Sequence, residues 1–199
     1  GRVPTRWRVT PLKYLGFFRN GISKSSDYFG SGYPFMNYGD VYNNEVVPSE
    51  FQGMVESSDE DREKFSVLRG DVFFTRTSES IDDIGISSTC LEDVPDTVFS
   101  GFVIRFRFFD EGIHLPEYSR YHFQTWWKDP LINSRMNIVT RSSLSQDVLG
   151  SVPVVVPPME EQREISSFLD EKTGLIDEEI RREEVSISLL QELRRSHIS

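Results

Sequence analysis

Up to residue 157, hydrophobic residues occur in short runs that are typical of β-strands. Residues 72–74 follow a turn signal formed by Gly70 and Asp71, and residues 152–156 are a Val-rich run before two prolines. Residues 102–108 alternate apolar and basic side chains toward their end, which predicts a half-exposed strand. Because polar stretches rich in Gly, Ser and Asp separate these runs, we expect a sheet-based domain with polar loops.

Two other segments of this part are expected to differ from strands. Residues 118–136 mix Tyr121, Trp126 and Leu131 with charged side chains, which favours a helix. Residues 56–64 are strongly charged, and we expect them to form a solvated loop or helix. Helices and short strands therefore belong to one domain, which indicates an α+β fold class.

From Pro158 onward the pattern changes to that of one long helix. Residues 159–199 contain one glycine and no proline, and they are dense in Glu, Arg, Leu and Ile. Pro158 suits a helix start, and Glu160 and Glu161 place negative charge in the first turn, where the helix dipole favours it. Apolar residues near heptad spacing predict a stripe along this helix. The predicted helix-pairing residues are Leu169, Ile176, Ile180, Ile187 and Leu190.

The chain therefore divides into a mixed α/β globular domain at 1–157 and a long C-terminal helix at 158–199. A helix of this length extends about 60 Å, so a small domain cannot cover its stripe. We expect the stripe to pack against a partner helix as a coiled coil. The alternative is a helix that breaks at Gly174 and folds back on its own domain.

Composition limits the classes of function that remain. The net charge is −10, with 16 basic and 21 acidic residues in 1–157 and 6 basic and 11 acidic residues in 158–199. Neither part is basic, so any contact with nucleic acid must be local or shared with other subunits. A lone Cys90 excludes an intramolecular disulfide and indicates a reducing compartment. We expect no membrane contact and a cytoplasmic protein, because no long apolar run is present.

No arrangement of residues nominates a catalytic site. The sequence lacks glycine motifs that bind phosphate and lacks a serine nucleophile motif. His114, His122 and His197 are scattered, with no Cys or carboxylate at ligand spacing, so no zinc site is expected. Residues 170–172 are nearest to a nuclease pattern, but they fall in the predicted long helix, where a solvated face is expected. We therefore expect neither enzyme activity nor a cofactor.

Two stretches carry a resemblance to a known family. The first is Gly70-Asp71-Val72-Phe73-Phe74-Thr75-Arg76-Thr77, and the second is Pro157-Pro158-Met159-Glu160-Glu161-Gln162 at the start of the long helix. With the segment from Trp7 to Leu15, they follow the order found in the specificity subunit of type I restriction-modification enzymes. The chain resembles this family over nearly its whole length, and the proline pair, the Glu-Gln pair and the long helix are the most specific signal.

The resemblance implies a target-recognition domain at 1–157 and a coiled-coil spacer helix at 158–199. In the family, each recognition domain reads one half of a bipartite site in double-stranded DNA. The helices of two halves pack antiparallel and dock methyltransferase subunits, and through them the restriction subunit. One half is present here, so the chain is either a half-sized subunit or a fragment of a full one. Its stripe would then pair with a second half or a second copy.

Side chains that read bases are expected on loops at one edge of a sheet, where Arg can pair with guanine and Asn with adenine. The DNA-binding candidates are Lys24, Ser25, Arg76, Thr77, Ser78, Arg135, Asn137, Arg141, Ser142 and Ser143. The alternative is that these are ordinary polar loop residues, with Arg76 paired to Asp71 or Asp82. Arg105 and Arg107 are instead expected on the solvated outer face of a strand.

Three functional hypotheses therefore stand at this point. The leading one is a non-catalytic module that recognises DNA sequence within a type I restriction-modification complex. The second is the recognition end of a DNA methyltransferase or nuclease whose catalytic part lies outside this chain. The third is a coiled-coil scaffold with no role in DNA binding.

Overall fold

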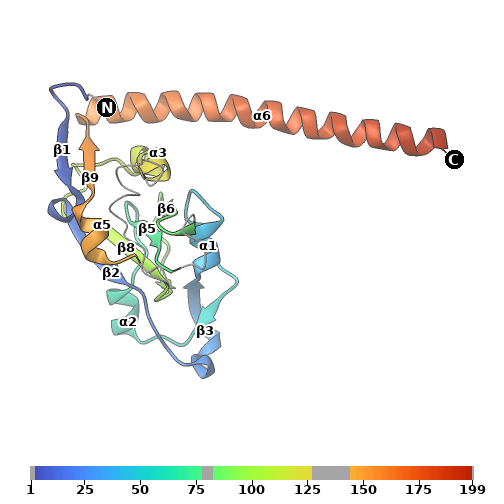
Figure 1. Cartoon of the computed structure of the whole chain (residues 1–199). Coiled ribbons are helices and arrows are strands. Elements are labelled where there is room, and N and C mark those ends of the chain that lie inside the picture. The colour runs from blue at the N-terminus through green and yellow to red at the C-terminus, as the bar shows by residue number, and fades with distance from the viewer. Residues whose placement is uncertain (1–2, 78–82, 127–143, 199) are drawn as a thin grey trace.

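A mixed α/β domain carries one long helix that projects from its upper end (Figure 1). The computed structural model describes residues 3–77, 83–126 and 144–198. The long helix is α6 (Met159–Ile198), and it is continuous through Gly174. The predicted α+β fold with a long C-terminal helix is confirmed. The alternative of a helix that breaks at Gly174 and folds back is wrong, because α6 extends straight away from the domain (Figure 1).

The central layer is an antiparallel sheet of four strands in the order β2-β8-β5-β6. Its strands are β2 (Gly16–Asn20), β8 (Val103–Phe108), β5 (Val72–Thr75) and β6 (Ser87–Thr89). The strands predicted around residues 72–74 and 102–108 are therefore confirmed as β5 and β8. Gly70 has a φ of +89°, a conformation that favours glycine, and it makes the predicted turn into β5.

Two smaller sheets complete the domain. One has the order β4-β3-β7, with β4 (Met54–Val55), β3 (Phe29–Met36) and β7 (Val98–Phe99). The other pairs β1 (Arg8–Pro11) with β9 (Pro153–Val156), which confirms the Val-rich strand before the prolines. This ribbon joins the two ends of the domain, so α6 begins beside the N-terminal segment (Figure 1).

Short helices fill the connections between the strands. They are the 3-10 turns η1 (Leu12–Tyr14) and η2 (Ser26–Tyr28), and the helices α1 (Tyr38–Tyr42), α2 (Asp59–Lys64), α3 (Pro116–Trp126) and α5 (Gln146–Ser151). The charged segment 56–64 contains α2, and the predicted helix from residue 118 is confirmed as far as Trp126. Within the described residues, no helix is both long and apolar enough to cross a membrane.

The two faces of the central sheet pack against different cores. Val72 and Phe74 of β5 join Ile104 and Phe106 of β8 in one hydrophobic cluster, which also contains Phe123 of α3. On the other face, Phe73 joins Val103 and Phe99 in a second cluster. Because both faces are covered, strands β5, β6 and β8 are largely buried rather than half-exposed.

The loop before α3 and the helix itself bring two of the histidines together. The rings of His114 and His122 have centroids 5.7 Å apart, and Tyr118 lies near both. The Nδ1 atom of His114 lies 2.5 Å from the hydroxyl of Ser119. The interpretation of these histidines as scattered is therefore wrong in space, although none of the described residues forms a group of three or more His, Cys, Asp or Glu that would hold a metal ion.

This histidine pair makes the stability of the domain depend on pH. Burial lowers the pKa of His122 to about 4 and also lowers the pKa of His114 well below its usual value. In the unfolded chain both pKa values return to about 6.5, so the unfolded state takes up protons first. The stability that the neutral His122 contributes is present above about pH 6.5. It decreases as pH falls toward 4, by up to about 3 kcal/mol.

Urea denaturation of the wild type and of a His122→Gln variant at pH 8 and pH 5 tests this dependence. We expect the free energy of unfolding to fall less in the variant than in the wild type between the two pH values. The difference between the two proteins at pH 8 serves as the control, because it measures the loss of packing alone. An equal decrease in both proteins would exclude His122 as a source of the acid sensitivity.

Candidate nucleic-acid interface

Three loop segments meet at one edge of the central sheet, where β2 and β5 end and β8 begins. The N–H of Ile22 donates to Phe99 O at 2.8 Å, and the N–H of Gly101 donates to Ile22 O at 2.9 Å. The N–H of Arg76 donates to Phe102 O at 3.0 Å. The loop after β2, the turn before β8 and the segment after β5 are therefore joined by backbone hydrogen bonds. We call this the convergent edge.

A fourth segment of the chain reaches the convergent edge at Leu144. The N–H of Leu144 donates to Arg76 O at 2.8 Å, and Gln146 Nε2 donates to Asn20 Oδ1 at 3.0 Å. Strand β8 leads from this edge to the loop 109–115, which contacts α6. The convergent edge therefore lies at the end of β8 that is remote from α6, and loops of this kind often carry binding residues.

The structure brings part of the predicted site together. Arg76 is half-buried, and its Nη1 donates to Gly101 O at 3.3 Å; Thr77 follows it directly. Ser25 is exposed at the start of η2. The alternative that pairs Arg76 with Asp71 is wrong, because Arg107 occupies both oxygens of Asp71. Other predicted residues lie outside the described part of the chain: Ser78, Asp82, Arg135, Asn137, Arg141, Ser142 and Ser143.

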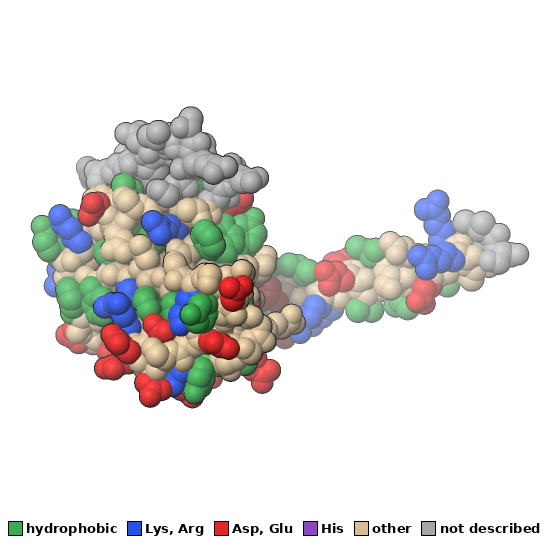
Figure 2. Space-filling model, turned by 90° about the horizontal axis from the view of Figure 1, so that it is seen from below, with side chains coloured by type: hydrophobic (Ala, Val, Ile, Leu, Met, Phe, Trp, Pro, Cys, Tyr) green, Lys and Arg blue, Asp and Glu red, His purple; other side chains and the backbone are tan. Residues whose placement is uncertain are grey.

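Lys24, another predicted DNA contact, already has partners within the domain. Its Nζ lies 2.9 Å from Asp61 Oδ2 and 2.6 Å from Glu56 O, and the hydrogen bond from Lys24 lowers the pKa of Asp61. Helix α2 begins with Asp59, Glu60 and Asp61 in its first turn. The positive charge of Lys24 is therefore offset by an acidic neighbour. Basic, acidic and hydrophobic side chains are interspersed on the face of the domain seen from below (Figure 2).

Arg105 and Arg107 correct the expectation of a solvated outer face. Arg105 is 2% exposed and donates to Ser66 O at 2.5 Å. Arg107 donates to both oxygens of the buried Asp71, at 2.6 and 2.7 Å. Burial raises the pKa of Asp71, and the hydrogen bond with Arg107 opposes this rise. The expectation was wrong because the alternating pattern of β8 does not reveal that a carboxylate from the turn before β5 pairs with its basic face.

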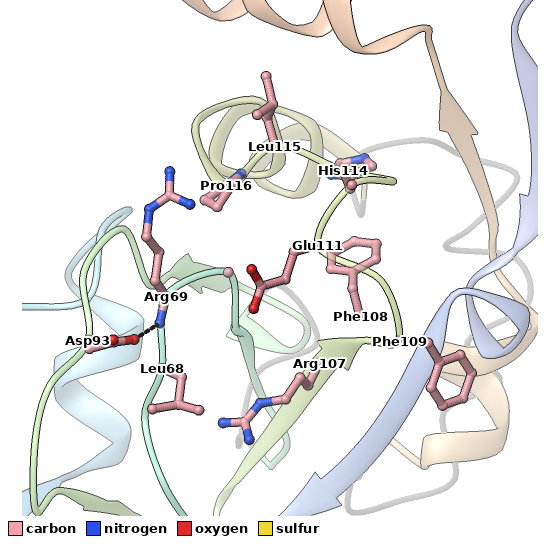
Figure 3. A pocket seen from close by; sticks show the side chains of 12 residues that line it. Leu68, Arg69, Asp93, Arg107, Phe108, Phe109, Glu111, His114, Leu115 and Pro116 are labelled. Atoms are coloured by element: carbon pink, nitrogen blue, oxygen red, sulfur yellow. Dashed lines mark hydrogen bonds between the residues drawn. The ribbon is translucent and has the colours of Figure 1, made fainter.

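A pocket of about 610 Å³ lies at the opposite end of β8, beside α3 (Figure 3). Arg107 and Phe108 project to opposite sides of β8 there, as alternation along a strand requires (Figure 3). The two arginines that line the pocket are both paired, Arg107 with Asp71 and Arg69 with Glu117 at 2.6 Å. This pocket therefore offers no unpaired arginine for phosphate, unlike a surface that tracks DNA.

The Glu-Gln pair at the start of α6 fixes the helix to the domain. Gln162 is fully buried; its Oε1 accepts from the N–H of Leu115 at 2.8 Å, and its Nε2 donates to Ile113 O and Pro157 O. Glu161 accepts from Arg6 at 2.6 Å and from Trp7 Nε1 at 3.0 Å, and these bonds lower the pKa of its carboxyl. Each residue of the pair thus bonds a different segment of the domain.

One further contact holds the second part of the helix base. Asp170 accepts from Arg120 at 2.7 Å and from Tyr121 at 2.6 Å, and both donors belong to α3. Leu169 is half-buried at this base, but from Gly174 to Ser196 every side chain of α6 is exposed. Four predicted helix-pairing residues lie in this exposed part: Ile176, Ile180, Ile187 and Leu190. Hydrophobic side chains accordingly recur along the rod in Figure 2.

A compact domain that gathers loops at one edge, and that holds a rod with an exposed apolar stripe at the other end, belongs to the class of modules that bind macromolecules. A family model described as the type I restriction modification DNA specificity domain matches residues 4–184. The chain belongs to this family. The resemblance seen in the glycine-aspartate strand and in the proline and Glu-Gln motif is therefore confirmed.

Two curated proteins are similar to the chain. The MjaX specificity subunit of a type I restriction enzyme from Methanocaldococcus jannaschii is 25% identical over 182 residues, which are 88% of this chain and 41% of that protein. The EcoKI specificity subunit from Escherichia coli is 25% identical over 181 residues, which are 83% of this chain and 38% of that protein. The chain thus spans less than half the length of these relatives.

Two solved structures share the fold. One, from work on the assembly and conformational transition of a type I R-M system, has a TM-score of 0.73 and 18% identity, over 97% of this chain and 45% of that chain. The HsdS subunit from Thermoanaerobacter tengcongensis has a TM-score of 0.63 and 16% identity, over 89% of this chain and 40% of that chain. At these identities the likeness shows the fold alone.

Proposed function

We propose that the chain reads one half of a bipartite site in double-stranded DNA, using side chains at the convergent edge. In this proposal residues 1–157 form the target-recognition domain and residues 158–199 form the spacer. The observation that carries it is the convergence of the segments around Ile22, Arg76 and Leu144 in a member of the DNA specificity family. Arg76 and Thr77 belong to these segments, and Lys24 and Ser25 follow Ile22 by two and three residues.

The proposal assigns α6 two partners. Its exposed stripe pairs with the helix of a second half-subunit or a second copy, because four large apolar side chains cannot remain in water without cost. The paired rods then dock methyltransferase subunits, and through them the restriction subunit. This assembly would work in the cytoplasm, where the host DNA of a bacterium or archaeon lies.

The proposal gives the chain no catalytic role and no cofactor. The catalytic steps belong to the methyltransferase and restriction subunits that it positions. The two alternative functions, an enzyme's recognition end and a scaffold without a DNA role, lead to different results in assays of DNA modification, cleavage and binding. A methyltransferase or nuclease end would modify or cut DNA once its catalytic part is supplied in one polypeptide, and a scaffold would bind no DNA sequence selectively with or without partner subunits.

Arg76 offers a direct test of base reading at the convergent edge. The whole chain, combined with its methyltransferase subunits, is compared with its Arg76→Gln variant for affinity to cognate and scrambled duplexes. We expect the variant to lose about 10- to 100-fold of the preference for the cognate site, since one bidentate base contact contributes about 1–3 kcal/mol of discrimination. Affinity for scrambled DNA should change far less.

Arg69→Gln is the matched control, because Arg69 is an exposed arginine at the other end of β8 and pairs with Glu117. It should leave the preference unchanged. If Arg76→Gln lowered the affinity for both duplexes equally, Arg76 would contact a phosphate or stabilise the loop rather than read a base. If the wild-type complex showed no preference for any sequence, the proposed function would be wrong.

A further inference from the structure

Two arginines face each other across β2 and β8. In the antiparallel register Arg19 lies directly opposite Arg105, and Phe17 lies opposite Arg107. Side chains at such positions have Cβ atoms about 5 Å apart and lie on the same face of the sheet. Arg107 lies on that face as well, two residues along β8. Like charges in this arrangement repel each other, so the fold keeps them together at a cost.

One carboxylate is too little to balance this cluster. Asp71 binds Arg107 through both of its oxygens, at 2.6 and 2.7 Å, and is therefore fully used. Arg105 makes one hydrogen bond, from Nη1 to Ser66 O, and its buried Nε has no partner. The Nε of Arg19 is also buried, and within the described residues it has no hydrogen-bond partner either. Among the described residues, two guanidinium groups of this cluster therefore have no carboxylate partner.

The surroundings increase the cost of the unbalanced charge. The Cζ atom of Arg105 lies 5.9 Å from the ring centroid of Phe17 and 5.4 Å from that of Phe99, and cation–π attraction to these rings offsets only part of the cost of burial. The pKa of Arg105 is lowered to about 10, mainly by burial; Asp71 opposes this decrease, and the nearby charges of Arg107 and Arg19 contribute to it. Buried donors without acceptors are rare in folded proteins, and those that occur require an explanation.

We propose that Arg19 and Arg105 form a binding site for a phosphate-like oxyanion. Tetrahedral oxyanions present several acceptor oxygens, and they match the fork of a guanidinium group. Arg19 lies on the edge strand β2 and is half-buried, so its side chain reaches the surface, with the buried Arg105 behind it. An anion held there would supply the missing acceptors and the missing negative charge together.

The position of Arg19 assigns the natural source of this oxyanion. The next residue, Asn20, accepts from Gln146, and Ile22 bonds the turn at Phe99 and Gly101. Arg19 therefore adjoins the convergent edge. We infer, on the basis of the proposed function, that the oxyanion is a phosphate of the DNA backbone, which fixes the register of the domain while the loops read bases. This site locates positive charge in a chain whose net charge is −10.

The oxyanion site is tested first without DNA. The Nε–Hε resonances of the whole chain are followed by NMR as sulfate replaces chloride at constant ionic strength. We expect saturable shifts at two arginine Nε–Hε resonances. In an Arg19→Gln variant one of these resonances is lost, and the remaining one no longer responds to sulfate. Arg181→Gln, which removes an exposed charge from α6, should leave both shifts intact.

The proposed site would be overturned if the shifts in the wild type did not saturate. It would also be overturned if the remaining resonance in Arg19→Gln still shifted and saturated with sulfate. Because the wild-type titration requires no substitution, the test holds even where a variant folds poorly. Inorganic phosphate is titrated in parallel, and we expect the same two resonances to respond.

The DNA source is tested with the same variants. Affinity of the assembled complex for cognate and scrambled duplexes is measured over a range of salt concentrations. We expect Arg19→Gln to lower the affinity for both duplexes by about 3- to 10-fold. The slope of log affinity against log salt should fall by about one, because one phosphate contact is lost. Arg181→Gln should change neither quantity.

Equal salt slopes of the affinity for Arg19→Gln and Arg181→Gln would overturn the assignment to DNA phosphate. The oxyanion site itself is tested independently by the NMR shifts with sulfate. If Arg19→Gln weakened the cognate duplex alone, the residue would read a base, and the assignment would again be wrong. Failure of the proposed function is seen separately, since it requires that the wild-type complex prefers no sequence.

Discussion

The double substitution Ile180→Asp and Ile187→Asp is expected to abolish pairing through α6. These two side chains are 51% and 53% exposed in the single chain, and both lie on the predicted stripe. In a pair of helices, the two substitutions remove four large apolar side chains from the interface. Each buried side chain of this size contributes about 1.5–3 kcal/mol, so the pair loses roughly 6–12 kcal/mol before the cost of burying carboxylates.

Sedimentation of the whole chain measures the effect. We expect the wild type to sediment as a pair and the double variant as a monomer at the same concentration. Arg181→Gln combined with Ser188→Asp changes the net charge by the same amount at neighbouring exposed positions outside the stripe, and it should still pair. A double variant that sediments like the wild type would show that the stripe does not hold the halves together.

The second large effect is a loss of stability, which is expected for the substitution Asp71→Asn. This carboxylate is fully buried and balances Arg107, while Arg105 and Arg19 lie on the same face of the sheet with no carboxylate partner in the part of the chain that the structure describes. Removal of one partner from a buried ion pair leaves an uncompensated charge and costs about 3–5 kcal/mol. The free energy of unfolding, measured with urea, should fall by this amount, which is a large fraction of the stability of a small domain.

Asp93→Asn provides the comparison for this variant. Asp93 is exposed and accepts a hydrogen bond from the N–H of Arg69 at 2.8 Å, so it has a backbone partner but no buried ion pair. Its replacement should cost less than about 1 kcal/mol. Equal costs for the two variants would mean that Asp71 acts as an ordinary turn residue rather than as the counter-ion of the arginine cluster.

Elements whose signals are local could be predicted from the sequence. The turn at Gly70 and the strand after it, the Val-rich strand before Pro157, and the helix from Met159 each depend on residues that are neighbours along the chain. The Glu-Gln motif was found through a resemblance. Its physical role became evident in the structure, because the partners of Gln162 lie in the loop 113–115.

Features that depend on register between distant strands could not be predicted. The burial of Arg105 and Arg107 follows from Asp71 and Ser66, which precede them by more than thirty residues and pack across the sheet. The opposition of Arg19 and Arg105 needs the register of β2 and β8, which no local pattern reveals. Arg19 was therefore missed as a candidate, and it stands in the sequence as one arginine after two phenylalanines.

Gly174 lies at the point where α6 leaves the domain, one residue after the last contact with α3 through Thr173. A Cβ added there would meet no atom within 4 Å, so packing does not require glycine, and glycine makes a helix easier to bend. The helix beyond it is a lever about 36 Å long. A bend of about 10° at its root moves the tip by about 6 Å, which is nearly two base-pair steps. The stiffness of this single joint would then set how strictly the spacing between two half-sites is measured.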